Sequence, residues 1–284
     1  MKTFQIGGVP EHFNLPWYLT LSAKEYTKEG VNLRWKDYPS GTGAMCKALR
    51  DKEIDMAVIL TEGIVRDIIK GNECKIVQVF VKSPLIWGIH VAQSSNYKSI
   101  EDLKGTTAAI SRYGSGSHLM AYVNAENQNW DISKDLGFQV IDNLDGAVQS
   151  LPHGEGDYFM WEKFMTKPHV DNGTFRKVGE CPTPWPCFVI AVRNEVLEKD
   201  SEAIQKILDI INNTTISFKE IPTIDKIIKN RYGIKLDDVR EWLSLTEWSQ
   251  RQLSENEVEN IQNQLLKLNL IKNKRHINNL LHNF

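Results

Sequence analysis

The sequence predicts an α/β protein of two lobes, each a mainly parallel sheet flanked by helices, with a helical C-terminal region. Three observations predict this class. Strand-like and helix-like segments alternate in βαβαβ order over the first 91 residues, and the alternation starts again after residue 99. From residue 201 the pattern becomes helical. With 284 residues, the chain is long enough to bury a core in each lobe.

In the first lobe, short apolar or alternating runs indicate strands, and longer periodic segments indicate helices. Pro16 in a first turn and Gly30 just after an end mark one of these helices. The expected strands are Thr3–Gly7, Val31–Asp37, Ile54–Ile59, Cys74–Val81 and Leu85–Val91, and the expected helices are Pro16–Glu29, Thr42–Asp51 and Glu62–Lys70.

The second lobe begins with a short helix at 99–105, where Ser99 and Asp102 have the spacing of a capping box. The strand Phe188–Val192 then returns the chain to the first lobe. The other expected strands are Thr107–Ile110, Phe138–Ile141 and Tyr158–Trp161, and the expected helices are Ser117–Gln128, Asn143–Leu151, Ala203–Lys219, Thr223–Gly233, Asp237–Leu245 and Glu255–Leu268. We expect the basic run 272–276 to form a solvated tail.

Composition excludes several classes of protein. The 34 Lys and Arg residues are balanced by 36 Asp and Glu residues, so no basic excess points to nucleic acid. No run approaches the roughly 20 apolar residues that a membrane span needs. The N-terminus enters a strand at once without an apolar signal core, which predicts a cytoplasmic protein, or a periplasmic one if a native signal was removed.

The sequence indicates no cofactor, no metal and no established catalytic motif. Cys181 and Cys187 flank a Pro- and Trp-rich loop, and we favour reduced thiols over a disulfide ring there. No CxxC pair, zinc spacing, HExxH pair or GxSxG elbow occurs. The turn at 111–118 lacks the spacing of both a P-loop and the GxGxxG dinucleotide fingerprint.

Polar and aromatic side chains follow the expected strands of the first lobe. Because ligands of open parallel sheets bind beyond the carboxyl ends of the strands, these side chains are candidates for ligand binding. They are Glu11, His12, Asn14 and Trp17 after the first strand, Ser40 and Thr42 after the second, and Glu62 after the third. The alternative is that Trp17 packs under the first helix and that Glu11 and His12 are solvated.

The second lobe contains a Gly/Ser turn between a strand and a helix, which places N–H groups and hydroxyls at the positive end of a helix dipole. Its candidate residues are Tyr113, Ser115, Ser117 and His118. Trp87, Trp161 and Glu162 lie at other strand ends, where rings suit a flat ligand. The alternatives are an ordinary connection that needs Gly for tight geometry, and tryptophans that belong to the core.

The order of elements, the Asp102-Leu103-Lys104-Gly105 entry into a strand and Gly/Ser turn, and Asp55-Met56-Ala57 after a short helix resemble type II periplasmic binding proteins. Within that family the chain is most similar to the branch of aliphatic-sulfonate, taurine and thiamine-pyrimidine-precursor binding proteins. The resemblance implies one lobe at 1–88 plus 189–284 and another at 91–187, with hinge crossings near 88–91 and 187–190. It also implies a ligand in the cleft.

We therefore expect a small-molecule binding protein that closes two lobes around a polar ligand, either heteroaromatic or anionic. One alternative is an enzyme of thiamine-pyrimidine-precursor or related heterocycle metabolism on the same fold, using His12, His118 or Cys187. A second is a ligand sensor that docks a partner. The expected partners are the ligand and, if the protein is exported, an ABC permease, with no nucleic acid and no membrane insertion. We expect a monomer or a loosely associated dimer.

Overall fold

The structure, a computed structural model, describes residues 2–284 and divides into two compact units. Unit 1 consists of the chain up to Ser83 together with Trp185–Phe284, and unit 2 consists of Pro84–Pro184. The chain thus leaves unit 1 and returns to it a few residues ahead of the crossings that the sequence suggests. Trp87 lies in unit 2 as a consequence, and Trp185 lies in unit 1.

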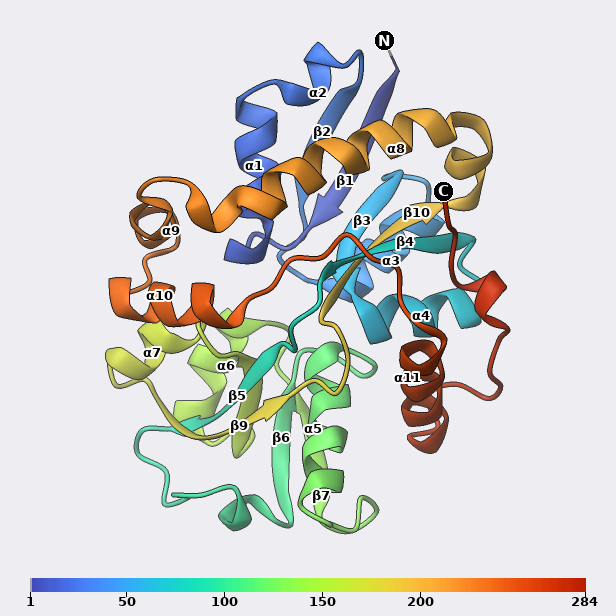
Figure 1. The fold of residues 1–284 in the computed structure, drawn as a ribbon. Helices are drawn as coiled ribbons and strands as arrows, with labels where there is room; N and C mark the ends of the chain where they lie inside the picture. Colours follow the sequence, from blue (N-terminus) through green and yellow to red (C-terminus); the bar gives the residue numbers. More distant parts are fainter. Residues whose placement is uncertain (1) are drawn as a thin grey trace. The chain divides into compact units, whose positions relative to one another are not determined.

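Unit 1 contains a five-stranded sheet in the order β2-β1-β3-β10-β4 (Figure 1). Strand β1 pairs in parallel with β2 and β3, whereas β10 runs antiparallel to β3 and β4. The strands are β1 (Thr3–Gly8), β2 (Asn32–Asp37), β3 (Met56–Leu60), β4 (Cys74–Val81) and β10 (Phe188–Arg193). All six residues of β10 are buried, as expected of a central strand covered on both faces.

The helices of unit 1 pack in two groups. Helices α1 and α2 contact α8, which runs across β1 and β2 in Figure 1, while α4 contacts both α3 and α11. Their bounds are α1 (Leu15–Ser22), α2 (Glu25–Lys28), α3 (Thr42–Arg50), α4 (Thr61–Ile69), α8 (Asn194–Ser217), α9 (Ile224–Tyr232), α10 (Leu236–Leu245) and α11 (Glu255–Lys267). Helix α8 is kinked at Asp200, whose backbone is not helical.

Unit 2 contains a second five-stranded sheet, in the order β7-β6-β8-β5-β9. Strand β6 is parallel to β7 and β8, and β5 is antiparallel to β8 and β9. The elements are β5 (Ile86–Ala92), β6 (Thr106–Ile110), α5 (Gly116–Asn127), β7 (Leu136–Val140), α6 (Leu144–Ser150), β8 (Tyr158–Glu162), α7 (Lys167–Asp171) and β9 (Phe175–Pro182). Short 3₁₀ turns complete the chain at His12–Asn14, Glu101–Leu103, Leu151–His153, Phe218–Glu220 and Ile277–Asn279.

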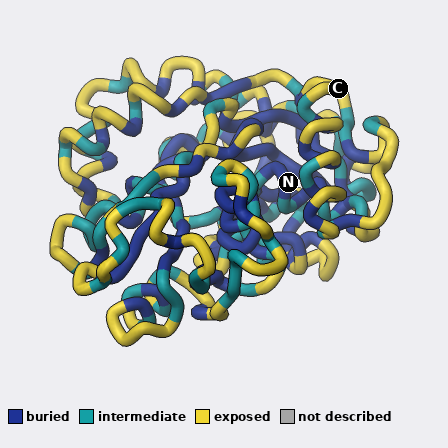
Figure 2. Tube along the Cα trace, turned by 90° about the horizontal axis from the view of Figure 1, so that it is seen from below, coloured by how far each residue is buried: buried dark blue, intermediate teal, exposed yellow. Residues whose placement is uncertain are grey.

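A cluster of buried side chains forms the core of unit 2, with Phe159 and Phe175 as its largest members and Trp161 packed against it. Along the chain, buried stretches alternate with exposed loops, drawn dark blue and yellow in Figure 2. Two α/β sheets flanked by helices confirm the predicted fold class. Within residues 2–284, no helix combines the length and apolar character needed to cross a bilayer.

The single helix predicted at Pro16–Glu29 is wrong. Helix α1 ends at Ser22, and Lys24 has a left-handed backbone (φ 57°) before the short α2. The break places Tyr26 in the core, where its ring stacks on Trp17 at 6.3 Å and its hydroxyl accepts a hydrogen bond of 3.0 Å from Thr20 Oγ1. Burial of a whole tyrosine ring, worth roughly 2 kcal/mol, outweighs two more helical residues.

Two further elements of unit 2 differ from expectation. The segment 99–105 contains only a 3₁₀ turn at Glu101–Leu103, although the Asp102 carboxylate accepts hydrogen bonds from the N–H groups of Lys98 and Ser99. Strand β9 has no counterpart among the predicted strands. It lies at the edge of its sheet and alternates irregularly between half-buried and exposed residues, so its sequence lacks the apolar run of a central strand.

Candidate functional site

Three serine hydroxyls gather where β6 of unit 2 ends and α5 begins. Ser117 Oγ lies 3.0 Å from both Ser111 Oγ and Ser115 Oγ, and it accepts a hydrogen bond of 3.0 Å from the Ser111 N–H. All three side chains are buried. We call these residues the serine turn (Ser111, Ser115 and Ser117). Ser111 belongs to the segment singled out in the sequence, but its part in this network is a property of the fold.

The serine turn forms the N-terminus of α5. Ser115 is the N-cap, and its hydroxyl oxygen accepts a hydrogen bond of 3.3 Å from the His118 N–H. Gly114 holds the left-handed conformation (φ 78°) that this sharp turn requires. Helix geometry leaves the N–H groups of Gly116 and Ser117 without intrahelical acceptors. The turn is therefore a local source of donors at the positive end of a helix dipole.

His118 holds this turn in place, whereas Tyr113 lies exposed on the same turn. His118 Nδ1 accepts a hydrogen bond of 2.9 Å from the Gly114 N–H, so the neutral ring carries its proton on Nε2. The ring packs edge-on against Phe138 at 4.6 Å and Tyr122 at 4.8 Å. Tyr113 is two-thirds exposed (67%) and meets His118 edge-on. His118 thus has a defined positioning role, while the Tyr113 ring is open to solvent.

Glu162, Trp161 and Trp87 lie at the same edge of the unit 2 sheet as the serine turn. Strands β6 and β8 are parallel neighbours, so the ends that lead to the serine turn and to Glu162 lie together. Trp87, near the start of the antiparallel β5, pairs directly with Glu162. The rings of Trp87 and Trp161 are 6.2 Å apart, and Trp87 Nε1 is buried without a hydrogen-bond partner in the described chain.

The Glu162 carboxylate closes the turn that follows β8. Its Oε2 accepts hydrogen bonds from the N–H groups of Phe164 at 2.9 Å and Met165 at 2.7 Å. Trp161 is half-buried and stacks on Phe159 at 5.4 Å. Glu162 and Trp161, which were predicted together, therefore have different roles. Glu162 fixes a loop, and Trp161 packs between the buried Phe159 ring and the surface.

Glu62 and Trp185 form a buried pair in unit 1. Trp185 Nε1 donates a hydrogen bond of 2.8 Å to Glu62 Oε2, and both side chains are buried. Burial raises the pKa of the Glu62 carboxyl to about 7, although the Trp185 hydrogen bond acts in the opposite direction. Thr61 binds the same loop, because its hydroxyl donates to the Pro186 carbonyl at 2.5 Å. The spacing along the chain gives no sign of this pairing.

Most of the ligand-binding residues predicted after β1 are buried in the core of unit 1. His12 stacks on Trp242 at 4.3 Å, and burial lowers its pKa to about 3, so the ring is neutral at pH 7. Trp17 is fully buried. Asn14 Nδ2 donates to the Val9 carbonyl at 2.8 Å. Glu11 is only partly exposed, and burial raises the pKa of its carboxyl to about 7.

Ser40 and Thr42 lie at the start of α3. Ser40 is exposed, and Gly41 takes a positive φ of 70° just before the helix. The methyl group of Thr42 fills the space above Gly63, where an added Cβ would come within 2.3 Å of it. Thr42 therefore mainly sets the close approach of α3 to α4. Since β1, β2 and β3 are parallel, the segments holding Glu11, Ser40 and Glu62 all follow the same edge of the unit 1 sheet.

The four cysteines are buried and free, so Cys181 and Cys187 form no disulfide. Burial raises the pKa of Cys181 to about 11, which keeps this thiol protonated. Cys187 Sγ lies 3.8 Å from the Val81 carbonyl oxygen inside unit 1. Among residues 2–284, no group of three or more His, Cys, Asp or Glu side chains is arranged to hold a metal ion.

These two units have the fold of type II periplasmic binding proteins, and comparison with known proteins agrees. The Ca3427-like family model of periplasmic binding proteins matches residues 87–181, which lie within unit 2. The chain is similar to the CA3427 gene product of Candida albicans, described as defining a new family with the generic periplasmic binding protein fold. The two are 25% identical, the match covers 99% of this chain and 96% of that one, and the TM-score is 0.90.

Two sulfonate-binding proteins share the fold at lower identity. The periplasmic aliphatic sulphonate binding protein SsuA from Escherichia coli is 16% identical, with a TM-score of 0.78 over 99% of this chain and 92% of that one. The alkanesulfonate-binding protein SsuA from Xanthomonas axonopodis pv. citri, bound to MOPS, is 15% identical, with a TM-score of 0.83 over 99% and 98%. A search of curated proteins gave no match. The predicted resemblance to periplasmic binding proteins is confirmed, and the two sulfonate-binding neighbours show the same fold.

Proposed function

We propose that this chain is a solute-binding protein and that the serine turn of unit 2 binds a hydrogen-bond-accepting group of a small polar solute. The observation that carries the proposal is the convergence of three serine hydroxyls with the N-terminus of α5. Such an end offers N–H donors and a positive dipole to oxygen atoms that bear negative charge. The periplasmic-binding-protein fold of this chain supports the same function.

The chemistry at this edge favours a solute with an anionic or heteroaromatic group. Donors at the serine turn suit a negatively charged oxygen, and the rings of Trp87 and Trp161 beside it suit a flat apolar part. Structural neighbours described as sulfonate-binding add support for an anionic end. Glu162 has its Oε2 engaged by backbone N–H groups, so we give it a role in loop position rather than in direct charge pairing.

In unit 1, Glu62 stays a candidate ligand-binding residue predicted from the sequence, and Trp185 fixes the orientation of its carboxyl group. A carboxyl with a pKa near 7 changes between donor and acceptor close to neutral pH. Below this pKa the protonated carboxyl can donate a hydrogen bond to a ligand, and above it the carboxylate can accept one. The closing of two lobes on a ligand, a permease partner and the compartment of the protein stay predictions from the sequence.

The states of the two candidate histidines favour a binding function over a catalytic one. A general acid or base works best with a pKa near the operating pH. The His12 ring instead stacks on Trp242 with a pKa of about 3. His118 Nδ1 is engaged by the Gly114 N–H and positions the turn.

We expect Ser117→Ala and Ser115→Ala each to weaken solute binding by roughly three- to tenfold, because each removes a hydrogen bond worth about 0.5–1.5 kcal/mol. Native mass spectrometry identifies the small molecule that co-purifies with the protein, and calorimetric titration with that molecule, and with MOPS, measures the affinities. Because Ser115 caps α5, its replacement also costs about 1 kcal/mol of stability.

The matched control is Asn143→Ala. Asn143 caps α6 in the same unit through a hydrogen bond of 2.9 Å from the Gly146 N–H. Its loss should lower stability about as much as the loss of Ser115 and leave solute affinity unchanged. Equal affinities for the wild type and both serine variants would remove the serine turn from the site.

A further inference from the structure

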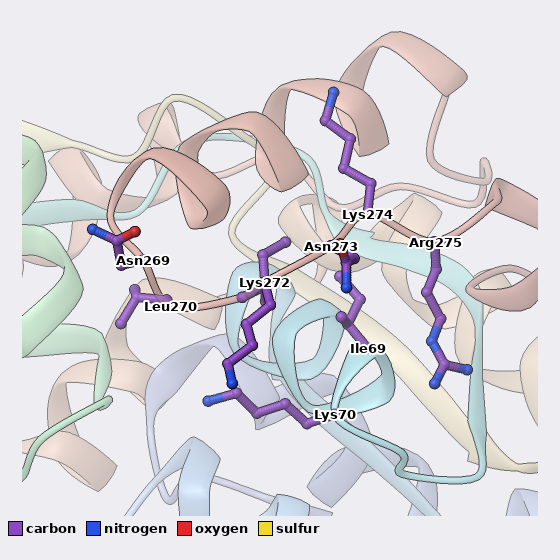
Figure 3. A pocket seen from close by; sticks show the side chains of 9 residues that line it. Ile69, Lys70, Asn269, Leu270, Lys272, Asn273, Lys274 and Arg275 are labelled. Atoms are coloured by element: carbon purple, nitrogen blue, oxygen red, sulfur yellow. The ribbon is translucent and has the colours of Figure 1, made fainter.

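A surface pocket of about 440 Å³ lies in unit 1, beneath the loop that follows α11 (Figure 3). One wall is the C-terminal end of α4, and the other is the loop 269–275. The lining residues are Ile69, Lys70, Asn269, Leu270, Ile271, Lys272, Asn273, Lys274 and Arg275. Four of them are cationic and none is acidic. The volume is within the range of about 300–1,000 Å³ usual for small-molecule sites.

The run 272–276 is exposed to solvent, as expected from the sequence, but its backbone is held in place rather than forming a loose tail. Gln262 on α11 binds both backbone groups of Arg275, since its Oε1 accepts from the N–H at 2.7 Å and its Nε2 donates to the carbonyl at 3.2 Å. The Ile271 side chain is buried, and its N–H bonds to the Leu265 carbonyl. A basic segment fixed at both ends presents its charges in a defined arrangement.

Three of the four cations form no ion pair in the part of the chain that the structure describes. Among residues 2–284, no ion pair is formed by Lys70, Lys272 or Arg275. Lys274 instead pairs with Glu259 at 3.5 Å, and in Figure 3 it extends away from Lys70. Asp67, the acidic residue of α4 nearest to Lys70 in the sequence, pairs with Arg50. The lining of the pocket therefore carries an excess of positive charge.

In the view of Figure 3 two of these cations end near one another, and the third ends apart from them. In Figure 3 the ends of Lys70 and Lys272 point toward one another, and Arg275 extends in the same direction as Lys272. Partial burial and the neighbouring Arg66 lower the pKa of Lys70, whereas the nearby Asp67 carboxylate acts in the opposite direction. An anion bound in this lining would make charge-assisted contacts with cations from both walls of the pocket.

We propose that this pocket is a second binding site, for a small organic or inorganic polyanion with phosphate or carboxylate groups, held by Lys70, Lys272 and Arg275. The pocket lies in unit 1, whereas the serine turn lies in unit 2, and Lys70 follows the opposite end of α4 from Glu62. Apolar atoms of Ile69 and Leu270 beside the cations allow an organic body as well as a charged end. The recessed shape favours a small anion over a lipid surface.

The probe is sodium pyrophosphate, titrated calorimetrically into the full chain at constant ionic strength. We expect binding by the wild type and at least a tenfold loss of affinity in the double variant Lys272→Glu/Arg275→Glu. The matched control is Lys206→Glu/Lys229→Glu, which makes the same charge change at two exposed lysines of α8 and α9. This control and Ser117→Ala should both bind pyrophosphate like the wild type.

Three outcomes would overturn the proposal. Equal loss in both double variants would mean that net charge alone attracts the probe. Unchanged binding in Lys272→Glu/Arg275→Glu would place the anion elsewhere. Tighter binding of a hexaglutamate peptide, or of phosphatidylglycerol vesicles, than of pyrophosphate would assign the pocket to a protein or a membrane. Because solute binding at the serine turn is measured separately, failure here leaves the proposed function untouched.

Discussion

Replacing Trp242 by alanine is expected to lower the free energy of unfolding by about 3–5 kcal/mol. The Trp242 side chain is buried (1% exposed) and joins rings from segments far apart in the sequence. It stacks on His12 at 4.3 Å and meets Phe13 at 5.3 Å and Trp248 at 5.7 Å edge-on. Loss of the indole leaves a cavity among rings that cannot all collapse into it, which adds to the lost burial.

Urea denaturation followed by far-ultraviolet circular dichroism measures this change. The control is Tyr113→Ala, because Tyr113 is a large aromatic residue that is mostly exposed, and its loss should alter stability by less than about 0.5 kcal/mol. If the Trp242 and Tyr113 variants unfold at the same urea concentration, the aromatic cluster does not stabilise unit 1 in the way its packing implies.

Glu62→Gln is expected to gain stability relative to the wild type as the pH rises from about 4.5 to 7, and to keep that gain at higher pH. Burial raises the folded-state pKa of Glu62 to about 7 from the ordinary value of 4.5. The folded state therefore binds a proton more tightly than the unfolded state, so this carboxyl reduces stability as pH rises from about 4.5 to 7. At about 1.4 kcal/mol for each unit of pKa, the effect is roughly 3 kcal/mol.

Glutamine has no such titration, yet its carbonyl oxygen still accepts the hydrogen bond from Trp185 Nε1. The difference in unfolding free energy between variant and wild type should thus shift by roughly 3 kcal/mol in favour of the variant between pH 4 and pH 8. Glu11, His12 and His90 also have shifted pKa values, but they titrate alike in both proteins and cancel.

Glu62→Leu is the companion variant. Leucine removes the titration and the acceptor together, so Trp185 Nε1 is left unpaired at a cost of about 1–3 kcal/mol at every pH. Parallel stability curves for the wild type and Glu62→Gln across pH 4 to 8 would contradict a raised pKa at Glu62.

Local patterns were sufficient for most of the fold. The apolar runs at Ile54–Ile59 and Phe188–Val192 predict β3 and β10, which are buried on both faces. Pattern reasoning failed where packing overrode propensity. Helix α1 breaks so that Tyr26 reaches the core, and the edge strand β9 forms although its sequence is mixed.

The candidate site divides in the same way. The Gly/Ser turn could be found in the sequence because a helix N-cap and a tight glycine turn are local features. The burial of His12 and Trp17 in the core could not be predicted from the sequence. A ring that follows a strand gives the same sequence pattern whether it faces a ligand or packs on Trp242. The cationic pocket was hidden as well, since Lys70 and Lys272 come from distant segments.

The sequence by itself determined most of the strands and helices, the two-lobed α/β class and the donor turn at Ser115–His118, because each depends on neighbours within a few residues. Only the tertiary structure decided which polar groups became partners. Glu62 and Trp185 are 123 residues apart, and their hydrogen bond exists because Thr61 and β10 bring the two segments together. Burial, and the raised pKa that follows from it, is a property of that packing and not of the residue type.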